Sequence, residues 1–277
     1  MEKLLIGKTV ASISTFHKKS LLGDPKPTIG KKIIAVKRYG KMLAVELTGN
    51  YVIGIHLKMS GQLLLKIANI KDQISKIHNQ KSKIGKGSNL EINKHTRVVI
   101  KFTDSSELHF IDQRIFGWVR IMRQEDVKTL RYVRLLGPEP WDISDNDLYN
   151  KIKHRKRAVK LVILDQEIIA GAGNIYANDA LWEAGIKPTR VAKTLRQKDC
   201  ETLRLALVKV LREGIKYGGS TAKDSKYVQL DGGSGKYQEH FRVYDRKGLQ
   251  CLRRDGGIIK KITLGGRGTY YCPICQT

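Results

Sequence analysis

A change in the period of the apolar residues divides this chain near residue 123. Up to residue 118, short runs rich in branched residues alternate between apolar and polar positions, as at 33–39, 42–47 and 97–102. Beyond residue 123 the apolar residues recur at the spacing of helix turns. A period of two predicts strands, whereas a period near 3.6 predicts amphipathic helices. We therefore expect an α+β protein with an N-terminal antiparallel β-sandwich and a helical C-terminal half.

The helical half contains signals for helix ends and for a core. Ser144 and Asp147 have the spacing of a helix N-cap, after a connector GPEPW at 137–141. Five residues share one face of a longer helix, which is expected to end at Gly218-Gly219. They are Cys200, Leu203, Leu207, Val210 and Leu211. Cys200 is therefore expected to be a core residue rather than a reactive thiol.

Two segments break the periodic pattern and are expected to be surface loops. The segment 66–95 is long and rich in lysine. The segment 218–240 is rich in glycine and serine and carries Lys223, Lys226 and Lys236. The residues that follow it have the pattern of a short hairpin closed by cysteines.

The charge of the chain indicates a polyanionic partner. The 52 lysine and arginine residues exceed the 26 acidic residues by 26, and nucleic acid is the usual partner for such an excess. No apolar run is long enough to span a membrane, and the N-terminus lacks the pattern of a signal peptide. We therefore expect a cytosolic protein. In that compartment, three cysteines within the last 27 residues, 251–277, favour a metal site over disulfides.

Four short stretches carry the chemistry: HLKMSG (56–61), DQRIFG (112–117), GAGNIYANDALWEAGI (171–186) and GGRGTYYCPIC (265–275). The glycines before Asn174 allow close backbone approach, and a helix that begins there offers free amides to a phosphate. The basic run KIKHRKRAVK (151–160) is either a solvated helix face or a phosphate contact.

Together with RYGKMLAVEL, LGPEPW, GGST, VYDRKG and a terminal Cys-x-x-Cys, these stretches resemble the formamidopyrimidine-DNA glycosylase family, which includes endonuclease-VIII-like relatives. The resemblance follows the family order along nearly the whole chain. LGPEPW and VYDRKG are closer to the oxidised-purine branch. The resemblance implies a base-excision-repair glycosylase and abasic-site lyase that removes 8-oxoguanine and formamidopyrimidines from duplex DNA after flipping the nucleotide. It also implies a monomer in the bacterial cytoplasm, associated with the nucleoid.

The resemblance implies four regions. Residues 1–122 would form the β-sandwich catalytic-type domain, and residues 123–219 the helix-two-turn-helix DNA-binding domain. Residues 220–240 would form a lesion-recognition-type loop, and residues 241–277 a degenerate zinc-finger hairpin.

The family also implies which residues replace the flipped nucleotide. Met59 and Phe116 would be wedges in the base stack, and Arg114 would face the orphaned base. An alternative for Met59 is a core methionine. Arg114 and Phe116 are expected on the same side of an extended segment. Ile115 replaces the basic residue usual between them and is expected to point the other way.

Further roles follow from the same motifs. His95 and Lys156 match DNA contacts of the family, and Asn174 matches its phosphate-contacting asparagine. Lys41 matches a lysine placed at the reacting sugar, with a solvent-exposed strand lysine as the alternative. Arg267 matches the arginine that grips a phosphate near the lesion and supports the second elimination.

The expected zinc finger lacks one ligand. Cys251, Cys272 and Cys275 match three of the four family cysteines, whereas Arg254 occupies the position of the second. Arginine stays protonated and cannot ligate zinc. We therefore expect a structural Zn²⁺ site with three thiolates, completed by water and of reduced affinity.

The N-terminus departs further from the family, whose members begin Pro-Glu-Leu-Pro-Glu-Val and use the proline amine to form a Schiff base with the sugar. This sequence starts with Met1 inside the end of the corresponding helix, and Glu2 is not the family glutamate. Impaired catalysis is therefore expected. The alternatives are a non-catalytic protein that binds damaged or intact duplex DNA and an RNA-binding protein, for which no fold signal is present.

Overall fold

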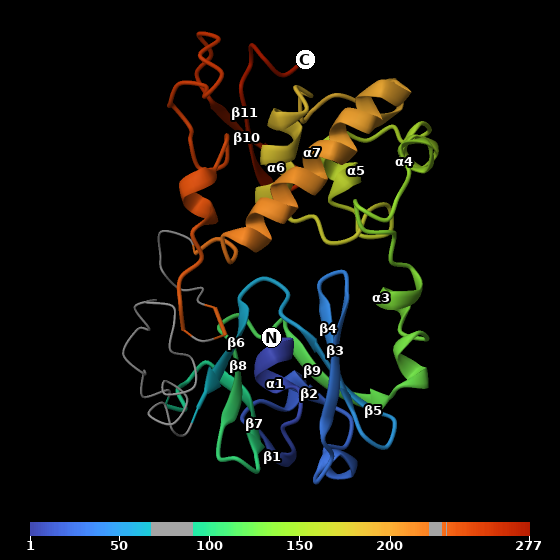
Figure 1. Cartoon of the computed structure of the whole chain (residues 1–277). Helices are drawn as coiled ribbons and strands as arrows, with labels where there is room; N and C mark the ends of the chain where they lie inside the picture. The colour runs from blue at the N-terminus through green and yellow to red at the C-terminus, as the bar shows by residue number, and fades with distance from the viewer. Residues whose placement is uncertain (68–90, 222–228, 231) are drawn as a thin grey trace. The chain divides into compact units, whose positions relative to one another are not determined.

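The computed structural model describes residues 1–67, 91–221, 229–230 and 232–277 (Figure 1). The chain divides into two compact units, here called unit 1 (Met1–Arg134 and Thr221–Gly235) and unit 2 (Leu135–Ser220 and Lys236–Thr277). Most of the expected loop at 66–95 lies outside the described residues, as do Lys223 and Lys226. The four regional boundaries expected from the sequence stay predictions. In the described part of the chain, no helix is long and apolar enough to cross a membrane.

Unit 1 is built on two β-sheets with the strand orders β1-β7-β8-β6 and β2-β9-β5-β4-β3. The strands are β1 Val10–Thr15, β2 Leu21–Leu22, β3 Ile33–Tyr39, β4 Met42–Leu47, β5 Tyr51–His56, β6 Gly61–Lys66, β7 Thr96–Phe102, β8 Glu107–Asp112 and β9 Trp118–Arg123. Neighbouring strands are antiparallel, except that the two-residue β2 runs parallel to β9. The predicted strands at 33–39 and 42–47 are confirmed.

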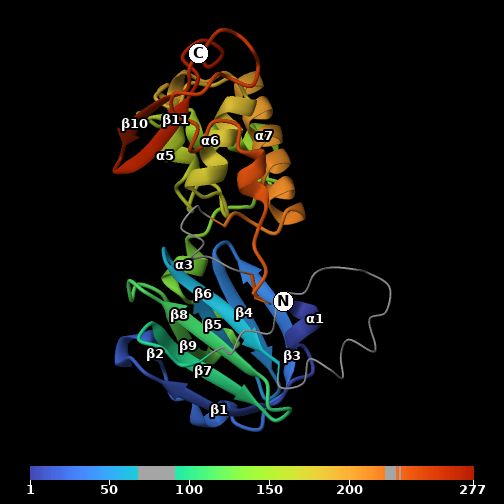
Figure 2. The same ribbon diagram turned by 90° about the vertical axis from the view of Figure 1, so that its left-hand side faces the viewer.

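The core of unit 1 lies between the two sheets (Figure 2). Val98 and Phe110 from the four-stranded sheet and Ile53 and Val119 from the five-stranded sheet are at most 2% exposed. The helix α1 (Glu2–Leu5) adds a buried side chain to the same core. The side chains that face this core occupy alternate positions along a strand, as Val98, Ile100 and Phe102 do in β7. The sequence pattern predicted this alternation, because side chains of a strand point to opposite faces in turn.

A second layer covers the outer face of the five-stranded sheet. The helix α3 (Arg131–Arg134) belongs to the segment that packs there. Its residue Tyr132 lies against a cluster that contains Met42 of β4 and Met122 of β9. Both faces of β4 are therefore largely buried, which explains the nearly continuous apolar run from residue 42 to 47.

Unit 2 is helical and ends in a hairpin (Figure 1). Its elements are α4 Asp145–Ile152, α5 Val159–Ile163, α6 Asn174–Glu183, α7 Gln197–Lys216, β10 Lys260–Leu264 and β11 Arg267–Tyr271. Short 3-10 helices occur in both units at Lys18–Ser20, Lys26–Thr28, Glu125–Val127, Ala192–Thr194 and Tyr237–His240. The predicted N-cap is confirmed, because the Ser144 hydroxyl accepts a hydrogen bond of 3.1 Å from the Asp147 amide. Cys200 is fully buried on the inner face of α7, as predicted.

The helix α6 connects the helical core to the C-terminal segment. The buried carboxylate of Asp179 accepts backbone N–H groups of Arg242, Val243 and Tyr244 at 3.1–3.2 Å. Asn178 accepts the amide of Tyr270 at 2.8 Å. Burial raises the pKa of Asp179, although the three N–H donors oppose that change. The stretch 171–186 therefore positions the hairpin as well as opening a helix.

Candidate nucleic-acid interface and metal cluster

Two loops of unit 1 expose large apolar side chains. Met59 lies in the turn between β5 and β6 and is 69% exposed, and Phe116 lies between β8 and β9 and is 54% exposed. The alternative of a core methionine is therefore wrong. The Arg114 guanidinium carbon lies 5.1 Å from the centre of the Phe116 ring, which is within the range of a cation–π contact.

The buried carboxylate of Asp112 joins these two loops. One of its oxygens accepts the Ser60 hydroxyl at 2.5 Å and the Arg114 amide at 3.1 Å. The other accepts the Gly117 amide at 2.7 Å. Ser60 in turn accepts from the Arg114 amide at 3.1 Å. Because Ser60 follows Met59 and Gly117 follows Phe116, a single side chain links the residues that follow both exposed side chains.

The segment that carries Arg114 and Phe116 was expected to be extended, but it is bent. Ile115 has a φ of 61°, in the left-handed region, which is uncommon for a branched side chain. Arg114 and Phe116 still contact one another. The bend brings them together, rather than the two-residue period of a strand. Asp112 supports this strained backbone with the hydrogen bonds described above.

His95 and Lys41 also belong to unit 1. His95 immediately precedes β7, and its backbone amide donates to Asn93 at 2.8 Å. Its Nδ1 is buried and has no hydrogen-bond partner among the described residues. Lys41 lies in the tight turn between β3 and β4, where its backbone amide donates to the Tyr132 hydroxyl at 2.9 Å. The side chain of Lys41 is exposed.

His56, at the end of β5, is a buried neighbour of this turn. Its ring lies 5.2 Å from the Tyr132 ring and 5.8 Å from the Trp118 ring. Burial and, to a smaller extent, the charges of Lys58 and Lys41 together lower the pKa of His56 to about 4. His56 is therefore neutral at physiological pH, and its Nδ1 accepts the Lys58 amide at 3.0 Å.

In unit 2, the predicted phosphate residues lie around the β10–β11 hairpin and the start of α6. The turn Gly265-Gly266 has φ values of 56° and 72°, the conformation that two-residue hairpin turns require. It presents Arg267, which is exposed. Asn174, the first residue of α6, donates through Nδ2 to the Gly268 carbonyl at 3.2 Å.

Lys160 was not among the predicted site residues, yet it binds the same part of β11 as Asn174 does. Its fully buried Nζ donates to the Gly268 carbonyl at 2.9 Å and to the Thr269 hydroxyl at 2.7 Å. Burial and, to a smaller extent, the charge of Arg267 lower the pKa of Lys160 to about 7. The only signal in the sequence was its place at the end of the basic run, among apolar residues.

The basic run is not a helix face. The helix α4 ends at Ile152 and α5 begins at Val159, so His154, Arg155, Lys156 and Arg157 lie between two helices and are exposed. The alternative of a solvated helix face is therefore wrong. The exposed position leaves a role for Lys156 in phosphate contact open.

Three cysteines and one aspartate converge near the C-terminus. The thiol sulfurs of Cys251, Cys272 and Cys275 and a carboxylate oxygen of Asp255 all lie within 4.8 Å of one another. Three thiolates and a carboxylate are a donor set that suits zinc. The group could therefore hold a metal. Asp255, which directly follows Arg254, was not among the residues predicted from the sequence.

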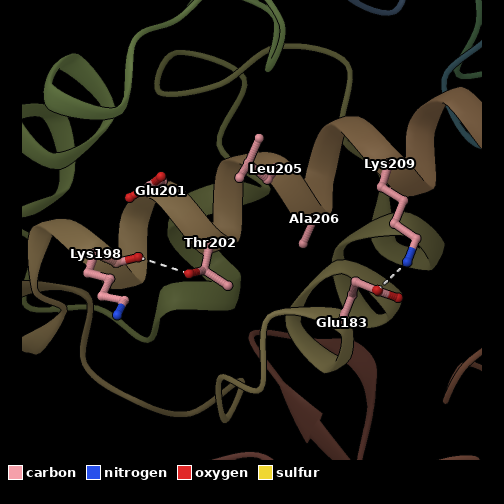
Figure 3. Close-up of a pocket in the computed structure, with 7 residues that line it drawn as sticks. All are labelled: Glu183, Lys198, Glu201, Thr202, Leu205, Ala206 and Lys209. Carbon is pink, nitrogen blue, oxygen red and sulfur yellow. Dashed lines mark hydrogen bonds and ion pairs between the residues drawn. The ribbon is translucent and has the colours of Figure 1, made fainter.

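A separate pocket lies on α6 and α7 (Figure 3). Its lining residues are Glu183, Lys198, Glu201, Thr202, Leu205, Ala206 and Lys209. Glu183 and Lys209 form an ion pair across it. None of the predicted site residues lines this pocket.

Comparison with known proteins decides the family. Residues 1–119 match the formamidopyrimidine-DNA glycosylase N-terminal domain, and residues 136–226 match the formamidopyrimidine-DNA glycosylase H2TH domain. The chain belongs to the formamidopyrimidine-DNA glycosylase family. A formamidopyrimidine-DNA glycosylase from Exiguobacterium sp. is 37% identical over 278 residues, which cover 98% of this chain and 92% of that protein.

Two solved structures of the Lactococcus lactis member of the formamidopyrimidine-DNA glycosylase family are similar to the whole chain. Each has a TM-score of 0.85 and 28% identity and covers 100% of this chain and 95% of its own. One is a mutant in complex with a Fapy-dG containing DNA, and the other is in complex with an abasic site containing DNA. The predicted α+β fold and the predicted membership of a DNA-repair glycosylase family are thus confirmed.

Proposed function

We propose that this chain is a base-excision-repair DNA glycosylase and abasic-site lyase that acts on oxidised purines, including 8-oxoguanine and formamidopyrimidines, in duplex DNA. The observation that carries the proposal is the pair of exposed apolar residues, Met59 and Phe116, on loops joined by Asp112. The Lactococcus lactis complex with Fapy-dG containing DNA supports the choice of lesion. The net charge of +26 supports a polyanionic partner.

Met59 and Phe116 are proposed to enter the base stack where the damaged nucleotide leaves it. Turning a nucleotide out of the duplex costs stacking energy, and inserted apolar side chains offset part of that cost. Among the described large apolar side chains of unit 1, Met59 and Phe116 are the two most exposed. The guanidinium of Arg114, a fork of N–H donors beside the Phe116 ring, suits the edge of the unpaired base.

The residues of unit 2 are proposed to bind the DNA backbone. Lys156 and Arg267 are exposed and positively charged, and Asn174 opens α6, where unpaired N–H groups favour a phosphate. Asn174 already donates to Gly268. Its proposed contribution is therefore partly to place the hairpin that carries Arg267. In unit 1, the half-buried His95 is proposed as a further DNA contact, as its place in the family motif implies.

Lys41 and Arg267 are proposed to assist the reaction at the sugar and at the departing phosphate. An amine that forms a Schiff base must be unprotonated, and an exposed lysine is protonated at neutral pH. Since the Lys41 side chain is exposed in unit 1, its proposed role is to bind the reacting sugar–phosphate rather than to be an efficient nucleophile. An arginine fork at position 267 would stabilise the phosphate that leaves in the second elimination.

The proposed setting is the cytoplasm of a bacterial cell, where the chain would act as a monomer on nucleoid DNA. The bacterial origin of its relatives supports this setting. Analytical ultracentrifugation of the chain with and without a short duplex measures the expected one-to-one complex, and a dimer on one lesion would contradict it.

Borohydride trapping tests the proposed chemistry. The substrates are a duplex with 8-oxoguanine opposite cytosine and a duplex with an abasic site. The 277-residue chain is compared with a version extended to the family's Pro-Glu start. Trapping of the extended version on 8-oxoguanine is the expected result, and the shorter chain measures the impairment expected from the sequence. Lesion binding without trapping by either version would favour the alternative, a non-catalytic lesion-binding protein.

A further inference from the structure

We propose that Asp255 is the fourth protein ligand of a closed zinc site, so that this finger binds zinc through three cysteines and one aspartate. The inference concerns the metal centre alone and does not depend on the proposed reaction. It replaces the expectation of three thiolates and a water. It also implies that Arg254 does not leave a gap in the coordination sphere.

The separations of the donor atoms fit a tetrahedral zinc. Bonds of about 2.3 Å to sulfur and about 2.1 Å to oxygen place two sulfurs about 3.8 Å apart and a sulfur and an oxygen about 3.6 Å apart. The sulfurs of Cys251 and Cys275 are 3.8 Å apart. The Asp255 oxygens lie 3.3 and 3.6 Å from the Cys272 sulfur. A sulfur–sulfur bond would be about 2.05 Å long, so Cys251 and Cys275 do not form a disulfide.

The backbone explains why Asp255, and not its neighbour, faces the sulfurs. The Arg254 amide donates to the Cys251 carbonyl at 3.0 Å, which closes a tight turn. Arg254 has a φ of 55° and an exposed side chain. The left-handed residue turns the chain, and the following side chain is directed toward the cysteines. The Gly257 amide then holds the Asp255 carboxylate with a hydrogen bond of 2.8 Å.

Outer contacts support the thiolates as they do in structural metal sites. The indole N–H of Trp182 donates to the Cys251 sulfur at 3.3 Å, and the Ile274 amide donates to the Cys272 sulfur at 3.4 Å. Three thiolates and a carboxylate exceed the charge of Zn²⁺ by two, and such donors offset the excess. Arg253 lies 4.6 Å from the Trp182 ring and binds the end of α6 through the carbonyls of Trp182 and Glu183.

The test measures metal directly and needs no DNA. Zinc content by atomic emission and the rate of zinc transfer to a chromogenic chelator are compared in the purified chain, Asp255→Ala and Asp255→Cys. Asp142→Asn, an exposed aspartate of unit 2 outside the cluster, is the control. Loss of an outer-shell partner alone weakens a metal site by about 10–100-fold. Asp255→Ala is therefore expected to weaken zinc binding by at least that factor, while Asp255→Cys and the control retain zinc.

Two further measurements keep the proposal falsifiable if Asp255→Ala does not fold. Cobalt titration of the unmodified chain should give the absorption of a tetrahedral site with three thiolates, and Asp255→Cys should add the charge-transfer intensity of a fourth. Arg254→Cys should not slow chelation, because no ligand position is vacant. Unchanged chelation in Asp255→Ala, or markedly slower chelation in Arg254→Cys, would overturn the proposal.

Discussion

At the scale of single residues, Asp112 determines the geometry of both exposed loops of unit 1. Its two oxygens accept three hydrogen bonds from Ser60, Arg114 and Gly117. An asparagine has the same shape but only one acceptor oxygen, so its NH₂ group would face at least one N–H or O–H donor. The loops that carry Met59 and Phe116 would then lose part of their common support.

We therefore expect Asp112→Asn to destabilise unit 1 by about 1–3 kcal/mol and to weaken binding to a duplex with an abasic-site analogue. Binding is measured by fluorescence anisotropy and stability by urea unfolding. Asp24→Asn, an exposed aspartate with a single local hydrogen bond to Lys26, is the control. Unchanged lesion binding in Asp112→Asn would show that the loops keep their positions without this carboxylate.

Some functional residues could be predicted from the sequence and others could not. Met59 and Phe116 stand in recognisable motifs, and their exposure agrees with a contact role. Asp112 stands in one of the same motifs, but its role depends on which amides its oxygens meet after folding. Asp255 could not be predicted from the family spacing, because that spacing points only to the position that Arg254 occupies. The positive φ of Arg254 is a property of the folded turn.

At the scale of elements, the link between α5 and the β10–β11 hairpin depends on Lys160. Below pH 7 its amine is protonated in both the folded and the unfolded chain. Its pKa is about 7 in the folded protein and ordinarily 10.5, so between these values the unfolded chain binds more protons. The free energy of unfolding should therefore rise with pH in this window.

We expect the stability of the unmodified chain relative to Lys160→Met to increase by about 1–2 kcal/mol between pH 7 and pH 9. Urea unfolding followed by tryptophan fluorescence measures it in a Trp118→Phe background, which leaves Trp141 and Trp182, both in unit 2. Lys156→Met, at an exposed lysine, should show no such change. Parallel pH curves for the unmodified chain and Lys160→Met would contradict the account.

Helices and strands could be predicted where the period of the apolar residues agrees with the residues that mark the ends of the element. The strands at 33–39 and 42–47 and the helix α7 follow directly from their apolar spacing. The prediction of an extended segment at Arg114 and Phe116 is wrong, because the left-handed Ile115 between them depends on the tertiary support of Asp112. The break between α4 and α5 was missed because a dense basic run masks the helix ends.

At the scale of the whole molecule, the net charge of +26 governs how DNA binding responds to salt. Each phosphate that the protein neutralises contributes about −0.9 to the slope of log K against log salt. We expect a steep negative slope for the unmodified chain. In Arg267→Gln the slope should be less negative by about 0.9. Lys19→Gln, an exposed lysine outside the predicted contacts, should leave the slope unchanged. A flat plot for the unmodified chain would contradict a phosphate-dominated interface.

The most direct test of insertion into the base stack is the ratio of two affinities, for a duplex with an abasic-site analogue and for the same duplex undamaged. The unmodified chain is compared with Met59→Ala, Phe116→Ala and, as control, Phe16→Ala, a 48% exposed phenylalanine of the same unit. Insertion of Met59 and Phe116 into the base stack predicts a preference for the damaged duplex that each wedge variant reduces by about 1–3 kcal/mol and that the control retains. Equal losses on both duplexes, or a preference that survives both wedge substitutions, would contradict it.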